Sequence, residues 1–359
     1  MFLLINQMII QFRKCFNRER TWKWFVVHVM GLMVRLNMRG VTSSLSALQM
    51  ESAIYKVSMD FFRSDAYEVT KLYENWINMT VCDECILRIS DRIVIDGDHT
   101  KVSKEGRRMP GLQVHHQESE NSGKGEFITG HLFAQLGAIM TNGETSRNIP
   151  IYTERQEVPP RKEGSKKPDG DTIVVQMGKL ATKTAKIIYD TTGERSIGVF
   201  DGYFCKKSMF NTTNLECSED GKPILNVVTR AQDNCVGFVL GVQAIPGQKR
   251  GRGRPKKAGK NVYGEKINLK LLLKDKSNFT KTTMKLYGKN TAVEYRCLDL
   301  LWRPTDSMMR FVVLSSNRGQ CILMTDDLTL TPEEIITIYC LRFKIETSFD
   351  EQKNIYDGS

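Results

Sequence analysis

Apolar residues recur at helical spacing in the first part of the chain. Through residues 1–85, aromatic and aliphatic positions repeat every three or four residues, most clearly at Trp22, Phe25, Val29 and Met33. Such a repeat places an apolar stripe along one side of a helix. The pattern therefore predicts an all-helical segment over residues 1–85.

The apolar period changes from helical to alternating at residues 89–102. In ISDRIVIDGDHTKV, Ile93 and Ile95 fall on one face of the predicted strand, and Asp96 and Asp98 fall on the other. Two carboxylates on one face of a strand are costly unless they bind a cation or lie in solvent. These two aspartates are therefore the first candidates for a functional site.

Strand and helix patterns alternate after this point. We predict a second strand at 126–140, a charged, Pro/Gly-rich loop at 148–170, a helix at 171–190 and a short buried strand that ends at Phe200. Asp201 comes directly after this strand and is followed by a glycine. An acid at the carboxyl edge of a buried strand is where α/β folds place a ligand site. The order of elements predicts an α/β fold with a second acidic residue at its sheet edge.

The stretch TLTPEEIITIYCLRFKIETSFDEQKNIYD, residues 329–357, predicts one long C-terminal helix. Thr331 is a suitable N-cap, and Glu334 completes a capping box with it. On a helical wheel, one apolar stripe is formed by Ile338, Leu341, Ile345 and Phe349. A neighbouring polar stripe is formed by Tyr339, Arg342, Glu346 and Lys353. The polar stripe is either the wall of a functional groove or a solvated charged face beside a core seam.

The segment between Asp201 and Glu346 is too long to be one connection between a strand and a helix. It contains strand-like runs at 223–229, 235–242, 293–302, 309–316 and 320–325. It also contains the basic stretch QKRGRGRPKKAGK, where Arg252 and Arg254 resemble the core of an AT-hook, whose arginines enter a narrow minor groove. The alternative interpretation of this stretch is a basic linker that contacts phosphates.

The composition favours a polyanionic partner. The 359 residues include 52 Lys and Arg against 41 Asp and Glu, a net charge of +11, which other basic soluble proteins share with nucleic-acid-binding proteins. The apolar run WFVVHVMGLMV is too short to span a bilayer, so it predicts a buried helix and no membrane partner. The nine cysteines are scattered, as expected in a reducing cytosol.

Two residue pairs give only weak signals for a metal site. Cys82 and Cys85 form a single C-x-x-C, whereas a structural zinc site needs four ligands. His115 and His116 are adjacent, and adjacent residues on a strand point to opposite faces, so at most one of them can join a given site.

Five blocks of the sequence resemble one family. The spacing Y-x2-R-x3-E-x6-K in YCLRFKIETSFDEQK resembles the signature of DDE transposases of bacterial insertion sequences, of the IS-four-like group. The other blocks, in the family's order, are DGDHTKVSKEGRRMPG (96–111), VFDGYF (199–204), VVTRAQDNCV (227–236) and RFVVLSSNRGQCILMTDDLTL (310–330). The five blocks are spread between residues 96 and 353.

The resemblance implies a site that cuts and joins DNA. Asp98, Asp201 and Glu346 would be the catalytic acids and the ligands of two Mg2+ or Mn2+ ions. Asp96 is the alternative to Asp98 as the first acid. Contacts with DNA are expected from Tyr339, Arg342, Lys353, Arg230, Arg252 and Arg254.

The resemblance also implies a ribonuclease H-like mixed sheet flanked by helices. The expected domains are a helical DNA-binding domain at 1–85, a first part of the catalytic core at 86–222, a β-rich insertion at 223–308, and the last strands with the Glu-bearing helix at 309–359. The implied function is metal-dependent cleavage and strand transfer at terminal inverted repeats. The implied partner is double-stranded DNA, both transposon ends and target, bound by a homodimer in the cytoplasm at the nucleoid.

Two other interpretations stay open. The chain ends six residues past Lys353, whereas the catalytic helix of the family continues, so a truncated or domesticated relative that binds DNA without cutting it is the alternative. A structure-selective nuclease on the same scaffold would share the acids but would lack strand transfer.

Overall fold

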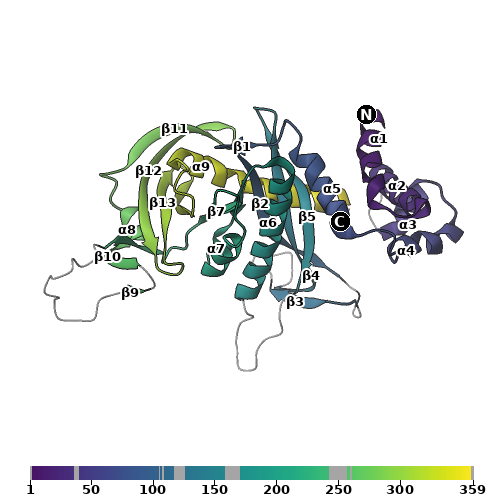
Figure 1. Ribbon diagram of the computed structural model, residues 1–359, viewed down its shortest axis with the longest axis horizontal. Helices are drawn as coiled ribbons and strands as arrows, with labels where there is room; N and C mark the ends of the chain where they lie inside the picture. The colour runs from purple at the N-terminus through teal and green to yellow at the C-terminus, as the bar shows by residue number, and fades with distance from the viewer. Residues whose placement is uncertain are drawn as a thin grey trace, which may run out of the picture. The chain divides into compact units, whose positions relative to one another are not determined.

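The computed structural model describes residues 2–35, 40–104, 106, 109–116, 126–157, 170–241, 257–258 and 261–356 (Figure 1). The chain divides into two compact units. One unit consists of Met1–Asp83 with Glu346–Ser359, and the other consists of Glu84–Ile345.

Helices make up the described part of the first unit. They are α1 (Phe2–Ile10), η1 (Gln11–Cys15), α2 (Glu19–Val34), α3 (Gly40–Ala47), η2 (Ser52–Ile54), α4 (Tyr55–Phe61), α5 (Val69–Val81) and, from Glu346 on, α10 (Phe343–Tyr356). The helical prediction for the N-terminal residues is confirmed, whereas their DNA-binding role stays a prediction.

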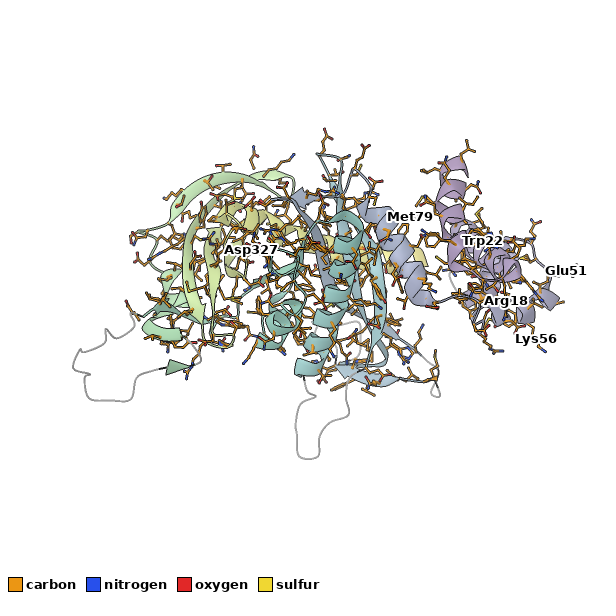
Figure 2. The ribbon with its side chains drawn as sticks, viewed as in Figure 1. Arg18, Trp22, Glu51, Lys56, Met79 and Asp327 are labelled. Carbon is orange, nitrogen blue, oxygen red and sulfur yellow. The ribbon has the colours of Figure 1, made fainter. Side chains whose placement is uncertain are left out.

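An aromatic cluster holds the N-terminal helices together. Phe16 is buried, and its ring lies 5.6 Å from that of Trp22 and 5.1 Å from that of Phe25, both on α2. Trp22 is labelled in Figure 2. Aromatic pairs at such distances stabilise packing beyond the area that they bury. The predicted burial of α2 does not extend to its end, because Met33 is 52% exposed. No helix in the described ranges, α2 included, is long and apolar enough to cross a membrane.

A mixed sheet forms the centre of the second unit. Over the described residues it has 14 strands, in the order β3-β4-β2-β6-β7-β14-β13-β12-β8-β10-β9, with β1 beside β2, β5 beside β4 and β11 beside β12. The strands are β1 (Arg88–Ile89), β2 (Arg92–Ser103), β3 (Gln113–His116), β4 (Phe127–Thr141), β5 (Ser146–Gln156), β6 (Ser196–Phe200), β7 (Leu225–Arg230), β8 (Val236–Leu240), β9 (Lys257–Ala258), β10 (Asn261–Asn268), β11 (Thr280–Leu286), β12 (Lys289–Trp302), β13 (Ser307–Ser316) and β14 (Gly319–Thr325). The helices of this unit are α6 (Gly170–Thr192), η3 (Gly202–Phe204), α7 (Lys207–Thr213), α8 (Leu269–Leu272), α9 (Pro332–Leu341) and the start of α10. The fold is therefore mixed α/β.

Three neighbouring strands at the centre of the sheet are parallel. β2 pairs with β6, and β6 pairs with β7, in parallel register. β4 and β5 extend the sheet from β2 as antiparallel strands, and β14 pairs antiparallel with β7. Parallel neighbours need a crossover connection, and α6 and α7 lie in the connections that lead to β6 and β7.

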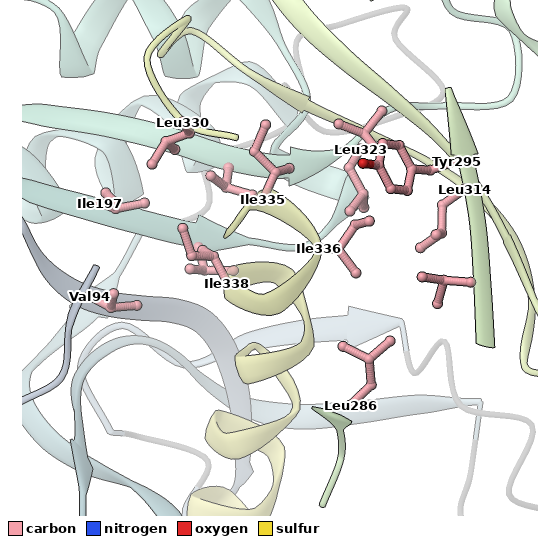
Figure 3. Packing of buried hydrophobic residues seen from close by; sticks show 14 of the residues in the cluster. Val94, Ile197, Leu286, Tyr295, Leu314, Leu323, Leu330, Ile335, Ile336 and Ile338 are labelled. Atoms are coloured by element: carbon pink, nitrogen blue, oxygen red, sulfur yellow. The ribbon is translucent and has the colours of Figure 1, made fainter. Parts of the chain in front are cut away.

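Helix α9 covers one face of these central strands. Ile335, Ile336 and Ile338 are fully buried and belong to one cluster with Val94 of β2 and Ile197 of β6 (Figure 3). Side chains alternate along a strand, so this face also carries every second residue after Val94 and Ile197. On this face, Val94 is followed by Asp96 and Asp98, and Ile197 is followed by Val199 and Asp201.

The predicted elements agree with the structure in most of this unit. The strand predicted at 126–140 and the helix predicted at 171–190 are confirmed as β4 and α6. The sheet is continuous across both limits of the predicted insertion at 223–308, because β7 pairs with β6 and β13 pairs with β12. The domain limits themselves stay predictions.

The loop predicted at 148–170 is wrong in its first part. β5 extends through Gln156 and pairs with β4 as a strand. Its alternation is interrupted at Pro150, which pairs with Gly137 where the register of the ladder shifts. Proline is tolerated at such bulges and on edge strands because no ladder hydrogen bond is needed there. Residues 158–169 of the predicted loop lie outside the described residues.

The C-terminal helix is broken at Arg342. α9 ends before this residue and α10 begins after it, so the prediction of one continuous helix is wrong. The amide of Arg342 donates to the carbonyl of Tyr339, and the amide of Ile345 donates to that of Arg342, each at 3.2 Å. Bonds between residues three apart tighten a helical turn. The predicted capping box of Thr331 and Glu334 is confirmed.

Candidate functional site

The register of the three parallel strands aligns one residue of each strand at the same level of the sheet. Val199 of β6 is paired with Asp96 of β2 and with Val228 of β7. Two residues after each of these three positions, the sequence has Asp98, Asp201 and Arg230. Residues two apart on a strand share a face, and neighbouring strands lie about 4.8 Å apart. Asp98, Asp201 and Arg230, hereafter the charged row, therefore lie side by side on the face that α9 covers.

Asp98 lies inside β2 and not at the end of the strand. β2 continues to pair with β4 as far as Ser103, whereas its parallel pairing with β6 stops at Asp96. Asp98 is therefore at the edge of the parallel part of the sheet, where it is half-buried. Its Oδ1 accepts a hydrogen bond from the amide of His99 at 2.7 Å.

Asp201 directly follows β6 and continues in extended conformation, with φ −74° and ψ 175°. Its Oδ1 accepts a hydrogen bond from the amide of Tyr203 at 2.9 Å, and its carbonyl accepts one from Oγ1 of Thr229 at 2.7 Å. An ideal Cβ placed on Gly202 would lie 3.2 Å from the carbonyl oxygen of Arg230. The glycine thus lets the turn after Asp201 pack closely on β7.

Phe200 closes the opposite face of the sheet behind the charged row. An ideal Cβ on Gly97 would lie 2.5 Å from its Cε1, and one on Gly198 would lie 2.6 Å from its Cε2, so the ring covers both glycines. The ring of Phe204 lies 5.5 Å from that of Phe200 and 5.2 Å from that of His99. Burial, together with the charge of a nearby lysine, lowers the pKa of His99 to about 4, so its ring is neutral at neutral pH.

Asp96, the alternative first acid, is fully buried. Its Oδ1 accepts a hydrogen bond from Nδ2 of Asn148, and its Oδ2 is buried with no hydrogen-bond partner among the described residues. Burial raises the pKa of Asp96 well above its usual range, although its own backbone amide, Asn148 and the charge of Arg342 oppose the shift. The burial of Asp96 leaves Asp98 as the more accessible of the two aspartates.

Tyr339 and Arg342, at the C-terminal end of α9, lie within electrostatic reach of the charged row. Burial raises the pKa of Tyr339 to about 12, the charges of Arg342 and Arg230 lower it, and that of Asp201 raises it. Arg342 also lowers the pKa of Asp96. Such effects fall off with distance. The structure thus brings the predicted residues of α9 together with those of β2, β6 and β7.

The remaining members of the predicted polar stripe lie in α10. The division between the two compact units falls between Ile345 and Glu346, so Glu346 belongs to the first unit and the aspartates belong to the second. Glu346 is half-buried in the first turn of α10. Only the backbone of Lys353 is described, and Arg252 and Arg254 lie outside the described residues.

The accessible carboxylates suit a hard cation. Mg2+ is commonly held by one or two carboxylates and keeps several of its waters, and Asp98 and Asp201 offer two half-buried carboxylates on adjacent strands. In the described part of the chain, no group of three or more His, Cys, Asp or Glu could hold a metal ion. Two carboxylates are a donor set that a partly hydrated Mg2+ accepts.

The histidine pair points to opposite faces, as predicted. His115 is buried with its Nε2 3.3 Å from the carbonyl oxygen of Gly130, whereas His116 is exposed. Cys82 and Cys85 are exposed and are not joined by a disulfide.

The sequence reasoning missed Asn148, which contacts Asp96 from β5. Asn148 lies in the stretch that was predicted to be a loop, and only the pairing of β5 with β4 brings it to this place. The available signal was Gly137, in the interior of the predicted strand 126–140, because an interior glycine often marks a close approach of another group.

No protein-family model matches this chain, and no curated protein matches it either. Among solved structures, the crystal structure of the NurA nuclease from Sulfolobus solfataricus aligns with a TM-score of 0.29 and 8% identity, over 86% of this chain and 96% of that one. A TM-score this low does not establish a shared fold. The function must therefore be argued from the residues of the site.

Proposed function

We propose that this chain is a DDE-type transposase that cuts DNA at the ends of an insertion sequence and joins those ends to target DNA. The reaction is a metal-dependent phosphoryl transfer on double-stranded DNA, and the mixed sheet is ribonuclease H-like. The observation that carries the proposal is the charged row, which sets two carboxylates and an arginine side by side within electrostatic reach of the end of α9.

The aspartates of the charged row are suited to hold cations against a phosphate. Asp98 and Asp201 are half-buried, and each accepts a hydrogen bond from a backbone amide. Groups that are fixed in advance need little rearrangement when the substrate binds. Two Mg2+ or Mn2+ ions, when bound, would supply Lewis-acid stabilisation to the attacking and leaving oxygens. Glu346, four residues after Arg342, is the third catalytic acid in this proposal.

The arginine and tyrosine side chains at the charged row are suited to hold DNA. Arginine presents a planar fork that matches two phosphate oxygens, and both Arg230 and Arg342 lie near Tyr339. Because its pKa is about 12, Tyr339 keeps its proton and can donate a hydrogen bond. Lys353, together with the two arginines of the AT-hook-like stretch, would add contacts to the DNA backbone, and the active complex would be a homodimer that holds two transposon ends.

The test is cleavage of labelled duplexes made from the DNA that flanks this gene, with Mg2+ or Mn2+ and with EDTA. We expect metal-dependent nicking at the boundary of the terminal repeat. Asp98→Asn, Asp201→Asn and Glu346→Gln should each lower nicking to background and change DNA binding little. In each variant the amide has the shape of the carboxylate that it replaces but lacks the negative charge that binds the metal ion. Asp190→Asn is the matched control, since Asp190 is an exposed aspartate of α6 that pairs with Lys186.

Two results would contradict this proposal. Binding of the repeat without nicking in any metal would indicate a non-catalytic DNA-binding relative. Nicking that persists in Asp201→Asn would show that the charged row is not the catalytic site.

A further inference from the structure

Asn148 reaches across a neighbouring strand to the buried Asp96. Asn148 lies on β5 and Asp96 on β2, with β4 between them. β4 carries Gly137 opposite Asp96, and an ideal Cβ on Gly137 would lie 1.8 Å from Nδ2 of Asn148. The amide therefore occupies the space that any other side chain at this position would fill, and it donates to Oδ1 of Asp96.

The strand neighbours of Asp96 are apolar. Val94 and Val199, the neighbours of Asp96 along and across the strands, are apolar and fully buried. Asp96 is 0% and Asn148 is 7% exposed, and Oδ2 of the first and Oδ1 of the second are buried without a hydrogen-bond partner in the described ranges. Burying such groups costs free energy that an aliphatic pair would not cost. Their presence beside the charged row points to a role in function.

The buried pair is close to the groups that are assigned to the reaction. Asp96 precedes Asp98 by two residues and lies on the same face of β2. The charges of Asp98 and Arg342 both act on its carboxyl group. A displacement of Asp96 would therefore change the surroundings of Asp98, one of the proposed metal ligands.

We propose that Asn148 is a positioning residue of the candidate active site: by passing over Gly137 it fixes the carboxyl group of Asp96, and through Asp96 it sets the place of Asp98. This inference rests on the proposed function, because it assigns Asn148 to the same reaction. Neither Asn148 nor Asp96 touches the DNA in this arrangement. Supporting residues of this kind typically contribute about 10- to 100-fold to metal affinity or activity.

The test compares Asn148→Ala, Gly137→Ala and the double variant of the full chain in the nicking assay. Asn148→Ala removes the hydrogen bond, and Gly137→Ala displaces the amide with its new methyl group. Each should lower kcat about 10- to 100-fold and raise the Mn2+ concentration for half-maximal rate, with little change in KM for DNA. The double variant should be no slower than Asn148→Ala alone, because the methyl group then has no amide to displace.

Gln156→Leu is the matched control. Gln156 is another buried polar residue of β5, 4% exposed, and it pairs in register with Leu132 of β4. This variant should keep the wild-type kcat and Mn2+ dependence. Thermal unfolding of every variant separates positioning from folding. Asn148→Ala introduces no clash, so it keeps the test decisive if Gly137→Ala does not fold.

A folded Asn148→Ala variant with unchanged kcat and Mn2+ dependence would overturn the inference and leave the proposed function intact. A wild-type chain that does not nick DNA would overturn the proposed function instead. In that case, calorimetric titration of the protein with Mn2+ alone decides the inference. Binding about 10-fold weaker in Asn148→Ala supports it, whereas equal binding, or no binding by the wild type, overturns it.

Discussion

Asp96 and Asp98 share one face of β2, yet they lie in opposite environments. Asp96 is fully buried, and burial raises its pKa well above its usual range. Asp98 is half-buried and accepts a hydrogen bond from the amide of His99. A carboxylate near solvent can exchange water for a metal ion, whereas a carboxyl group without solvent contact cannot do so unless the sheet opens. The difference in burial therefore argues for Asp98 as the ligand and Asp96 as its support.

Asp326 should make the protein less stable as the pH rises from about 4 to about 6. Burial raises the pKa of Asp326 to about 6, although the amide of Val227, which donates to its Oδ1 at 2.8 Å, opposes the shift. In the unfolded chain the pKa of an aspartate is about 3.9. Between these two values the folded chain binds more protons than the unfolded chain. The free energy of unfolding therefore falls with rising pH, by about 3 kcal/mol over the whole window.

Asp326→Asn removes this titration and should flatten that part of the stability profile. Urea unfolding of wild type and variant at about pH 4 and about pH 7 measures the difference. Arg92, which pairs with Asp327, also lowers the pKa of Asp326, so the quantity to compare is the change in stability between the two pH values and not the stability at one pH. A variant whose stability falls as steeply as that of the wild type would show that Asp326 is not the titrating group.

At the scale of elements, the start of α9 depends on its capping box. Oγ1 of Thr331 accepts a hydrogen bond from the amide of Glu334 at 3.2 Å, and Oε2 of Glu334 accepts one from the amide of Thr331 at 2.7 Å. Oε1 of Glu334 also accepts a hydrogen bond from the hydroxyl of Ser90 at 2.6 Å, which connects the helix to the turn before β2. Thr331→Ala should lower the free energy of unfolding by about 1 kcal/mol. Thr331→Ser keeps the oxygen and serves as the control. Equal losses in urea unfolding for both variants would contradict the capping role.

Elements with a clear apolar period were predictable from the sequence. In the C-terminal stripe, Ile338 and Ile345 are fully buried, as the helical period predicted. β5 was not recognised because Pro150 and several charged residues interrupt its alternation, and only the pairing with β4 shows that it is a strand. The break at Arg342 follows no proline or glycine, so local sequence gave no warning of it.

Only the parts of the candidate site that depend on a local pattern were predictable from the sequence. Asp98 and Asp201 could be found because each follows an apolar strand run, which is a local pattern. Their alignment with Arg230 depends on the register between strands that are far apart in the sequence. The contact of Asn148 with Asp96 depends on two strand pairings and on the absence of a side chain at Gly137. Such long-range arrangements have no signature in a single sequence.

At the scale of the whole molecule, the net charge of +11 suits a polyanion, and its effect on DNA binding can be measured residue by residue. If Arg342 contacts one phosphate, Arg342→Ala should weaken binding of a duplex and lower the slope of log K against log salt by about 0.9. Arg342→Lys should keep the slope but bind more weakly, because lysine lacks the planar fork. Fluorescence anisotropy of a labelled duplex over a range of KCl concentrations measures both quantities.

Lys222→Ala is the control for the loss of one positive charge, since Lys222 is exposed, pairs with Asp220 and lies outside the charged row. Its salt slope should equal that of the wild type. An unchanged salt slope in Arg342→Ala would show that Arg342 does not contact a phosphate. Arg342 lowers the pKa of Asp96, so it would then balance that buried carboxyl group and not a phosphate. In that case Arg342→Ala should lose thermal stability in the absence of DNA, whereas the loss of a phosphate ligand should lower the affinity for DNA and change thermal stability little.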